Sequence, residues 1–297
     1  MLETAELLKK VRKLEIVAGK LVEDVIGGAY HSVFKGRGIE FDEVREYTFE
    51  DDVRDIDWNV SARLNAPYVK KYIEERELTV LLMVDISNSM TLGSSGAVAG
   101  KAVEAAALLG LSAINNHDRV GLSLFNDKIV KFLLPRNGRH NNLRLIRELV
   151  SSSGTRQSGK TDIAYALQHA CKVLVKRSVI FVISDLADDP AKLEKALKLA
   201  RRRHDVIVLH TFDNTWLDLP DGVNMLYDAE SGSFIRLNGK SKKAFVENLQ
   251  QQLLMRQELC RRAGVEVIAL DCQSNTATAL MNFFKRRRSR RNHGKAS

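Results

Sequence analysis

Residues 78–90, LTVLLMVDISNSM, contain the side chains of this sequence that are best suited to binding a metal ion. Asp85, Ser87 and Ser89 occupy alternate positions, so in a nearly extended chain their oxygen atoms face the same way. One carboxylate and two hydroxyls form half of an oxygen-rich shell, the ligand type that Mg²⁺ prefers. An ordinary strand end is the alternative interpretation, because Asp, Ser and Asn are all common in turns.

A buried strand must position these residues. Residues 78–84 contain one polar side chain, Thr79, and such an apolar run is typical of a strand buried on both faces of a parallel sheet. The polar residues then lie at the carboxyl end of the strand. In open α/β sheets this is the edge at which ligands bind.

Two later segments contain further candidates for the same site. Residues 179–183, VIFVI, form a second apolar run, followed by Ser184 and Asp185 at the same kind of edge. Thr161 begins a stretch, TDIAYALQHACKVL, whose apolar residues recur at helical spacing. The set resembles the metal-ion-dependent adhesion site of von Willebrand factor A domains, and its members are Asp85, Ser87, Ser89, Thr161 and Asp185. The resemblance implies that the hydroxyls ligate Mg²⁺ or another divalent cation and that the aspartates bind it directly or through water.

Strand-like and helical segments alternate along the rest of the chain. We expect strands at residues 119–125, 129–134, 205–211 and 265–270, a hairpin at 224–227 and 233–237, and helices at 99–115, 141–150, 190–203, 241–263 and 276–284. The short turn at residues 126–128 makes the second strand of its hairpin antiparallel. The pattern predicts an α/β fold with a doubly wound, mostly parallel sheet and one antiparallel edge strand. By the resemblance above, this sheet is expected to be von Willebrand factor A-like.

The segment before this sheet is harder to interpret. Residues 4–26 show the spacing of an amphipathic helix. Beyond them the periodicity is poor, and nine acidic residues lie between positions 40 and 57. We expect an irregular, solvated acidic region that a few apolar side chains attach to a core, namely Phe41, Tyr47, Ile56 and Trp58.

Three stretches of this segment, GRGIEFDEVREY, DDVRDIDWNVSAR and PYVKKYIEERE, resemble the signature of the domain of unknown function 58 family. These are bacterial proteins that carry a von Willebrand factor A-like domain directly after the signature. Glu50 departs from the family pattern, which usually has glycine there. The resemblance implies that the chain is an adaptor or co-chaperone of a MoxR-type AAA+ ATPase, whose Asp or Glu carboxylate would complete the metal site. It divides the chain into a signature segment (1–77), the von Willebrand factor A-like domain (78–284) and a basic tail (285–297).

A nucleotide-binding motif offers an alternative function. Residues 154–161, GTRQSGKT, match the P-loop pattern, in which Lys160 and Thr161 would contact the phosphates and Mg²⁺. A P-loop needs a strand directly before it, whereas residues 143, 146 and 149 follow helical spacing. A P-loop nucleotide hydrolase therefore remains the alternative to an interaction module. Lys160 is the residue that distinguishes the two.

The composition bears on four further properties: disulfides, zinc binding, enzymatic activity and membrane spans. The three cysteines, Cys171, Cys260 and Cys272, form no CxxC pair and fall in apolar patterns, so we expect buried thiols and neither disulfides nor zinc. No general acid–base pair or nucleophile beside a histidine is visible, and we expect a non-enzymatic protein. No apolar run approaches the ~20 residues of a membrane span. A cytoplasmic protein is the resulting expectation.

The net charge of +9 is concentrated in the tail. Residues 285–297 carry seven Lys or Arg and no acid, so the remaining chain carries only +2. A solvated, disordered end is one interpretation. Attraction to nucleic acid or to an anionic membrane is the other.

Overall fold

The computed structural model describes most of the chain. It covers residues 40–49, 51–73, 77–91, 97–153, 159–217, 225–228, 233–236 and 238–293. The helix predicted over residues 4–26 lies outside these residues, as do residues 154–158 of the P-loop-like segment.

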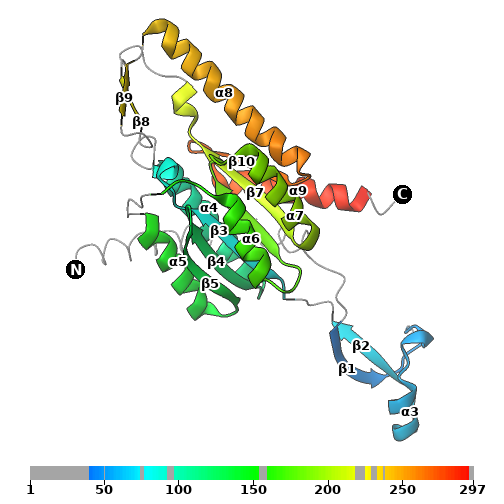
Figure 1. Ribbon diagram of the computed structural model, residues 1–297. Coiled ribbons are helices and arrows are strands. Elements are labelled where there is room, and N and C mark those ends of the chain that lie inside the picture. The colour runs from blue at the N-terminus through cyan, green and yellow to red at the C-terminus, as the bar shows by residue number, and fades with distance from the viewer. Residues whose placement is uncertain are drawn as a thin grey trace.

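A six-stranded sheet forms the centre of the molecule, with the strand order β10-β7-β6-β3-β4-β5 (Figure 1). Its strands are β3 (Thr79–Asp85), β4 (Arg119–Phe125), β5 (Ile129–Arg136), β6 (Val179–Ser184), β7 (Asp205–Phe212) and β10 (Glu266–Asp271). Neighbouring strands are parallel except for β5, which pairs antiparallel with β4 at one edge. This order is that of a doubly wound sheet whose first strand, β3, lies at the switch point. The predicted fold, including its antiparallel edge strand, is confirmed.

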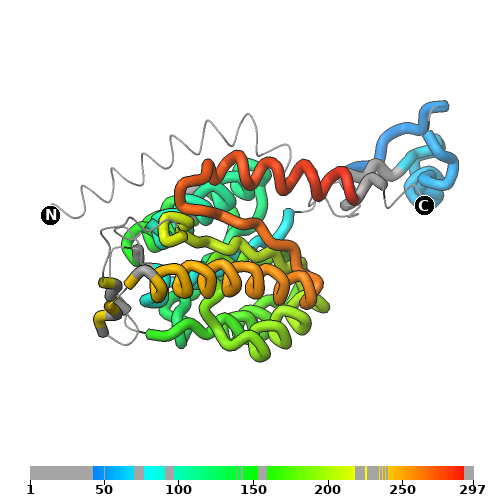
Figure 2. Tube along the Cα trace, turned by 90° about the horizontal axis from the view of Figure 1, so that it is seen from above, coloured from blue at the N-terminus to red at the C-terminus, as the bar shows by residue number. Residues whose placement is uncertain are grey.

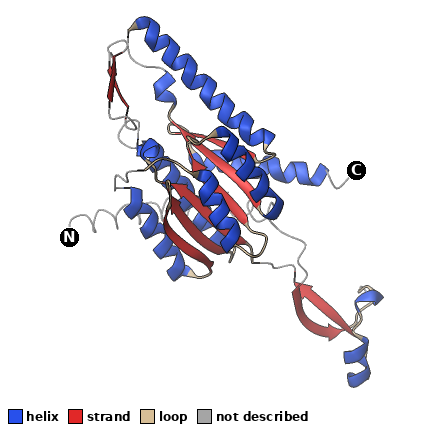
Figure 3. Ribbon diagram, in the orientation of Figure 1, coloured by secondary structure: helices blue, strands red, loops and turns tan. Residues whose placement is uncertain are grey.

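Helices cover both faces of the sheet (Figure 3). One hydrophobic core contains side chains of α4 (Ala97–Asn115), α5 (Arg139–Ser153) and α9 (Thr276–His293). The core on the opposite face contains side chains of α6 (Ile163–Val173), α7 (Pro190–Arg203) and α8 (Gly239–Arg262). The sheet is therefore the middle of three layers.

Strand β3 shows why its sequence is an unbroken apolar run. Val80, Leu82 and Val84 belong to the first core, whereas Leu81 and Met83 belong to the second, and each is at most 1% exposed. Burying one such side chain contributes about 1.5–3 kcal/mol. The strand is thus fixed from both sides up to Asp85, where the candidate metal ligands begin.

Helix α4 is the one helix among the described residues that is long and apolar enough to cross a membrane. The apolar runs of the sequence did not reveal it, because Lys101 and Glu104 interrupt them. Most of its apolar window, 67%, is buried in the fold. Lys101 is itself buried, and its Nζ donates hydrogen bonds to Ser274 O (2.8 Å) and Thr276 Oγ1 (3.1 Å). Within this fold α4 is the central helix of one layer.

The acidic segment is ordered, so the expectation of an irregular region was wrong for residues 40–73. Strand β1 (Glu40–Glu46) pairs antiparallel with β2 (Tyr68–Ile73), and η2 (Val53–Asp55) and α3 (Trp58–Leu64) connect them. This unit lies apart from the main sheet in Figure 1.

Several acids of this unit bind its backbone. Asp57 begins α3 by accepting hydrogen bonds from the N–H groups of Asn59 (3.0 Å) and Val60 (3.3 Å), and Asp52 accepts one from Arg54 N (3.0 Å). Tyr47 and Ile56 are half-buried, whereas Trp58 is 68% exposed and does not anchor the unit to a core. Asp52 and Asp57 therefore act as caps of short elements.

The basic end of the chain is helical, whereas a solvated, disordered tail was one of the two expectations. Helix α9 continues through the basic residues to His293, so the predicted boundary at 284/285 falls inside a helix (Figure 2). The described part of the tail, residues 285–293, is therefore not a disordered end. A small hairpin of β8 (Met225–Asp228) and β9 (Ser233–Arg236) was predicted correctly. The remaining short elements are η3 (Asn88–Thr91) and η5 (Asn214–Leu217).

Candidate metal centre

Asp85, the last residue of β3, is held in place by two hydrogen bonds. Its side chain is buried, with the whole residue 1% exposed. Its Oδ1 accepts a hydrogen bond from Ser87 N (2.9 Å), and its Oδ2 accepts one from the Ser184 hydroxyl (2.6 Å). Because Ser184 ends β6, the two central strands of the sheet fix this carboxylate together.

Three hydroxyls form a chain beside Asp85. Thr161 Oγ1 donates to Ser87 Oγ at 2.8 Å, and Ser87 Oγ lies 3.0 Å from Ser89 Oγ. Ser87 is buried, whereas Ser89 and Thr161 are half-buried. The structure thus brings Thr161 to the two serines across a separation of 74 residues. Their oxygen atoms lie close enough together to ligate one ion.

Thr161 is positioned by the start of α6. Asp162 caps this helix by accepting a hydrogen bond from Tyr165 N (2.7 Å), and its own N–H donates to Asn126 O (3.0 Å). Asp188 Oδ2 accepts from the N–H groups of Ile163 (2.8 Å) and Ala164 (3.3 Å) at the same helix end. The loop after β4 and the loop after β6 therefore both hold Thr161 beside Ser87.

Asp185 supplies the second carboxylate of the site. It is half-buried, and its Oδ1 accepts a hydrogen bond from Ala187 N (3.1 Å). Burial, followed by repulsion from the Asp185 carboxylate, raises the pKa of Asp85 to about 7 from its ordinary value of 3.8. Two carboxylates that repel each other in a buried site are an arrangement that a cation would relieve.

The groups present fit a hard divalent cation. Two carboxylates and three hydroxyls are oxygen donors of the type that Mg²⁺ binds. The described residues contain no cluster of three or more His, Cys, Asp and Glu side chains, so a site here would depend on the hydroxyls. Zinc, which favours nitrogen and sulfur ligands, fits this set poorly.

Three residues that shape this site are not among the five predicted ligands: Ser184, Asn126 and Asp188. The sequence placed Ser184 at the same sheet edge, and its role, the hydrogen bond to Asp85, emerges only from the pairing of β6 with β3. Asn126 and Asp188 act through contacts with residues far away in sequence, for which the chain carries no local pattern.

The P-loop alternative lacks its strand. Residues 139–153, which precede Gly154, form helix α5 and not a strand, so no strand end directs backbone amides toward a phosphate there. Lys160 is exposed, and Thr161 is hydrogen-bonded to Ser87. The nucleotide-hydrolase interpretation of this segment is therefore wrong in its structural premise.

Comparison with known proteins identifies relatives of the chain. Residues 43–258 match a family described as "Protein of unknown function DUF58". Uncharacterized protein Rv1480 of Mycobacterium tuberculosis is 29% identical over 233 residues, which cover 78% of this chain and 73% of the relative.

Two of the solved structures with detectable similarity come from Bacteroides. An aerotolerance-related membrane protein from Bacteroides fragilis is 19% identical with a TM-score of 0.46, covering 72% of this chain and 99% of that one. BatB from Bacteroides thetaiotaomicron is 21% identical with a TM-score of 0.46, covering 71% and 98%. The fold assignment itself rests on the strand order described above.

Proposed function

For this chain, which belongs to the family described as protein of unknown function DUF58, we propose from the geometry of its site that it is a Mg²⁺-dependent protein-interaction module. The residues that would hold the cation are Asp85, Ser87, Ser89, Thr161 and Asp185. The observation that carries the proposal is the contact of Thr161 with Ser87 and Ser89 beside the buried Asp85 carboxylate.

The balance of charged and neutral donors indicates what the site could bind. Three of the five donors are neutral hydroxyls, so a cation here would still attract an external anion, such as an Asp or Glu carboxylate of a partner. Ser89 and Thr161 are half-buried, whereas Asp85 and Ser87 are buried. The partly exposed hydroxyls thus mark the side from which a partner would approach.

The partner that we propose is a MoxR-type AAA+ ATPase, for which the chain would act as an adaptor or co-chaperone in the cytoplasm. The support for this step is the family resemblance alone, because no residue of this chain identifies the ATPase. The role is non-enzymatic, in keeping with an interaction site built from fixed hydrogen-bonded donors.

A retention experiment tests the proposal. Immobilised protein is exposed to host lysate in Mg²⁺ and in chelator, and retained proteins are identified by mass spectrometry. Asp85→Asn keeps the size of the side chain and removes its charge. Asp189→Asn is the matched control, because Asp189 is an exposed carboxylate that caps α7 through Lys192 N (2.8 Å), a role that Asn also fills.

The expected result is an AAA+ ATPase that wild type and Asp189→Asn retain only in Mg²⁺ and that Asp85→Asn does not retain. Retention of the same ATPase by Asp85→Asn, or in chelator, would show that the metal centre is not its binding site. Thermal unfolding of each variant confirms that it is folded.

A further inference from the structure

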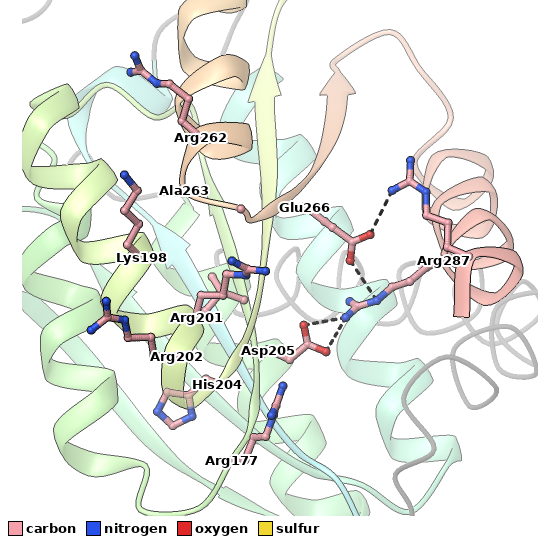
Figure 4. A pocket seen from close by; sticks show the side chains of 13 residues that line it. Arg177, Lys198, Arg201, Arg202, His204, Asp205, Arg262, Ala263, Glu266 and Arg287 are labelled. Carbon is pink, nitrogen blue, oxygen red and sulfur yellow. Dashed lines mark hydrogen bonds and ion pairs between the residues drawn. The ribbon is translucent and has the colours of Figure 1, made fainter. Parts of the chain in front are cut away.

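A second concave site lies at the opposite edge of the sheet. A pocket of about 820 Å³ is formed where β7 and β10 begin and where α7 and α8 end, with one wall from α9 (Figure 4). Its residues adjoin the amino ends of the strands, whereas the candidate metal centre lies at the carboxyl ends. The two sites are therefore separate, and the proposed interaction function does not use this pocket.

The pocket is strongly cationic. Seven of its 13 lining residues are Lys or Arg and two are acidic. Both acids are paired, since Arg287 contacts Asp205 Oδ1 and Oδ2 at 2.7 and 2.6 Å and Glu266 Oε2 at 3.1 Å. In the described part of the chain, Arg177, Arg201 and Arg202 form no ion pair, so their charge is available to a ligand.

His204 lies behind the arginines as a buried, neutral ring. It lines the pocket and is 1% exposed. Its Nδ1 accepts a hydrogen bond from Ser178 N (3.3 Å), so the neutral ring carries its proton on Nε2. Burial, with Arg203 and Arg177 nearby, lowers the pKa of His204 and keeps the ring neutral. Its Nε2 has no hydrogen-bond partner among the described residues, although buried polar atoms rarely lack one.

Offsetting of helix dipoles accounts for some, but not all, of the Lys and Arg residues that line the pocket. Arginines in the last turn of a helix offset the helix dipole, which suits Arg201 and Arg202 in α7 and Arg262 in α8. Arg290 lies in the last turn of α9 and pairs with Glu266 (3.8 Å), so it too has a structural role. Arg177 precedes β6 and ends no helix, and capping of helix dipoles does not explain its position.

Gly264 leaves room for the Arg201 side chain. This glycine follows α8 with φ +70°, a conformation that favours glycine, and a Cβ built there would collide with the Arg201 guanidinium. The Arg201 head group therefore lies directly against the Gly264 backbone at the pocket, where a larger residue would displace it.

We propose that this pocket binds a compact, multiply phosphorylated anion, which Arg177, Arg201 and Arg202 contact. Guanidinium groups match phosphate oxygens in fork geometry. The volume falls within the range of small-ligand sites, about 300–1,000 Å³. The lining contains no Phe, Tyr or Trp on which a base could stack, which favours a ligand recognised by its phosphates over a nucleic acid.

Calorimetric titration with tripolyphosphate at low salt tests the proposal. The test variant is Arg201→Gln with Arg202→Gln. The matched control, Lys192→Gln with Lys195→Gln, removes the same charge from exposed positions of the same helix. We expect wild type and the control to bind one anion per chain with similar affinity and the test variant to bind at least tenfold more weakly. Equal weakening of both double variants, or no saturable binding by wild type, would overturn the proposal.

Two further arms identify the source of the phosphate. Vesicles of phosphatidylcholine containing phosphatidylinositol 4,5-bisphosphate that sediment wild type but not the test variant would support the proposal with a lipid headgroup as the ligand. Tripolyphosphate binding without vesicle binding would support it with a free anion. Single-stranded DNA that displaces tripolyphosphate at equal phosphate concentration would overturn the choice of a compact anion in favour of a nucleic-acid backbone.

Discussion

Replacing Arg287 by Met should destabilise the protein by about 2 kcal/mol. The Arg287 side chain is 14% exposed, and those of its partners Asp205 and Glu266 are 30% and 33% exposed. Exposed ion pairs contribute about 0–1 kcal/mol, whereas breaking a buried pair costs about 3–5 kcal/mol, so a half-buried bidentate pair falls between these values. Without Arg287 the two carboxylates lose their closest cation. Met keeps an unbranched apolar side chain at this position but also removes the cation–π contact with Phe283, whose ring centroid lies 6.0 Å from the Arg287 guanidinium carbon.

Urea denaturation of Arg287→Met beside Arg286→Met measures this effect. Arg286 is exposed, and among the described residues its Nε bonds only to Asn282 O (3.3 Å) within α9, so its replacement should change stability by no more than about 0.5 kcal/mol. A double-mutant cycle with Asp205→Asn isolates the pairwise energy. If Arg287→Met is no less stable than Arg286→Met, the basic segment of α9 is not part of the folded domain and our description of it is wrong.

Three further predictions concern other parts of the chain. The depressed pKa of His204 means that the unfolded chain binds its proton first, so stability falls as the pH drops below about 6.5. His204→Gln should therefore reduce the slope of the free energy of unfolding against pH in this range, measured by urea denaturation. An unchanged slope would show that His204 is not the group that titrates. Gly121→Ala should lower the free energy of unfolding by about 1–3 kcal/mol in urea denaturation, because a Cβ would lie 2.8 Å from Leu133 O and 2.9 Å from Pro135. A variant as stable as wild type would show that the backbone is not crowded there. Ser184→Ala removes the donor to Asp85 and should weaken metal binding at least about tenfold in a calorimetric titration, whereas wild-type affinity would show that the hydroxyl has no positioning role.

Apolar periodicity predicted the sheet well because burial imposes it. Residues 80–84 contact a core on each face of β3, and such a strand has an unmistakable apolar run. The acidic segment carried no such signal, since its strands form only a two-stranded sheet. Its acids Asp52 and Asp57 bind local backbone N–H groups, which composition alone does not distinguish from solvation.

The basic end was misjudged for a related reason. A run of arginines looks solvated when its partners are unknown. Asp205 lies 82 residues before Arg287, and Glu266 begins the strand before α9, so neither has a local spacing that marks it as a partner. At the candidate metal centre the family motif identified five positions, and the structure brings the hydroxyls of Ser87, Ser89 and Thr161 together. The residues that hold Thr161 in place, Asn126 and Asp188, depend on loop contacts that no local pattern encodes.

The most direct test of the central claim is a calorimetric titration of the chelator-treated protein with Mg²⁺, comparing wild type, Asp85→Asn and Asp189→Asn. Our account predicts one bound ion per chain for wild type and for Asp189→Asn, and no detectable binding for Asp85→Asn. Equal affinity of Asp85→Asn and wild type, or no binding by any of the three proteins, would contradict a metal centre at the end of β3.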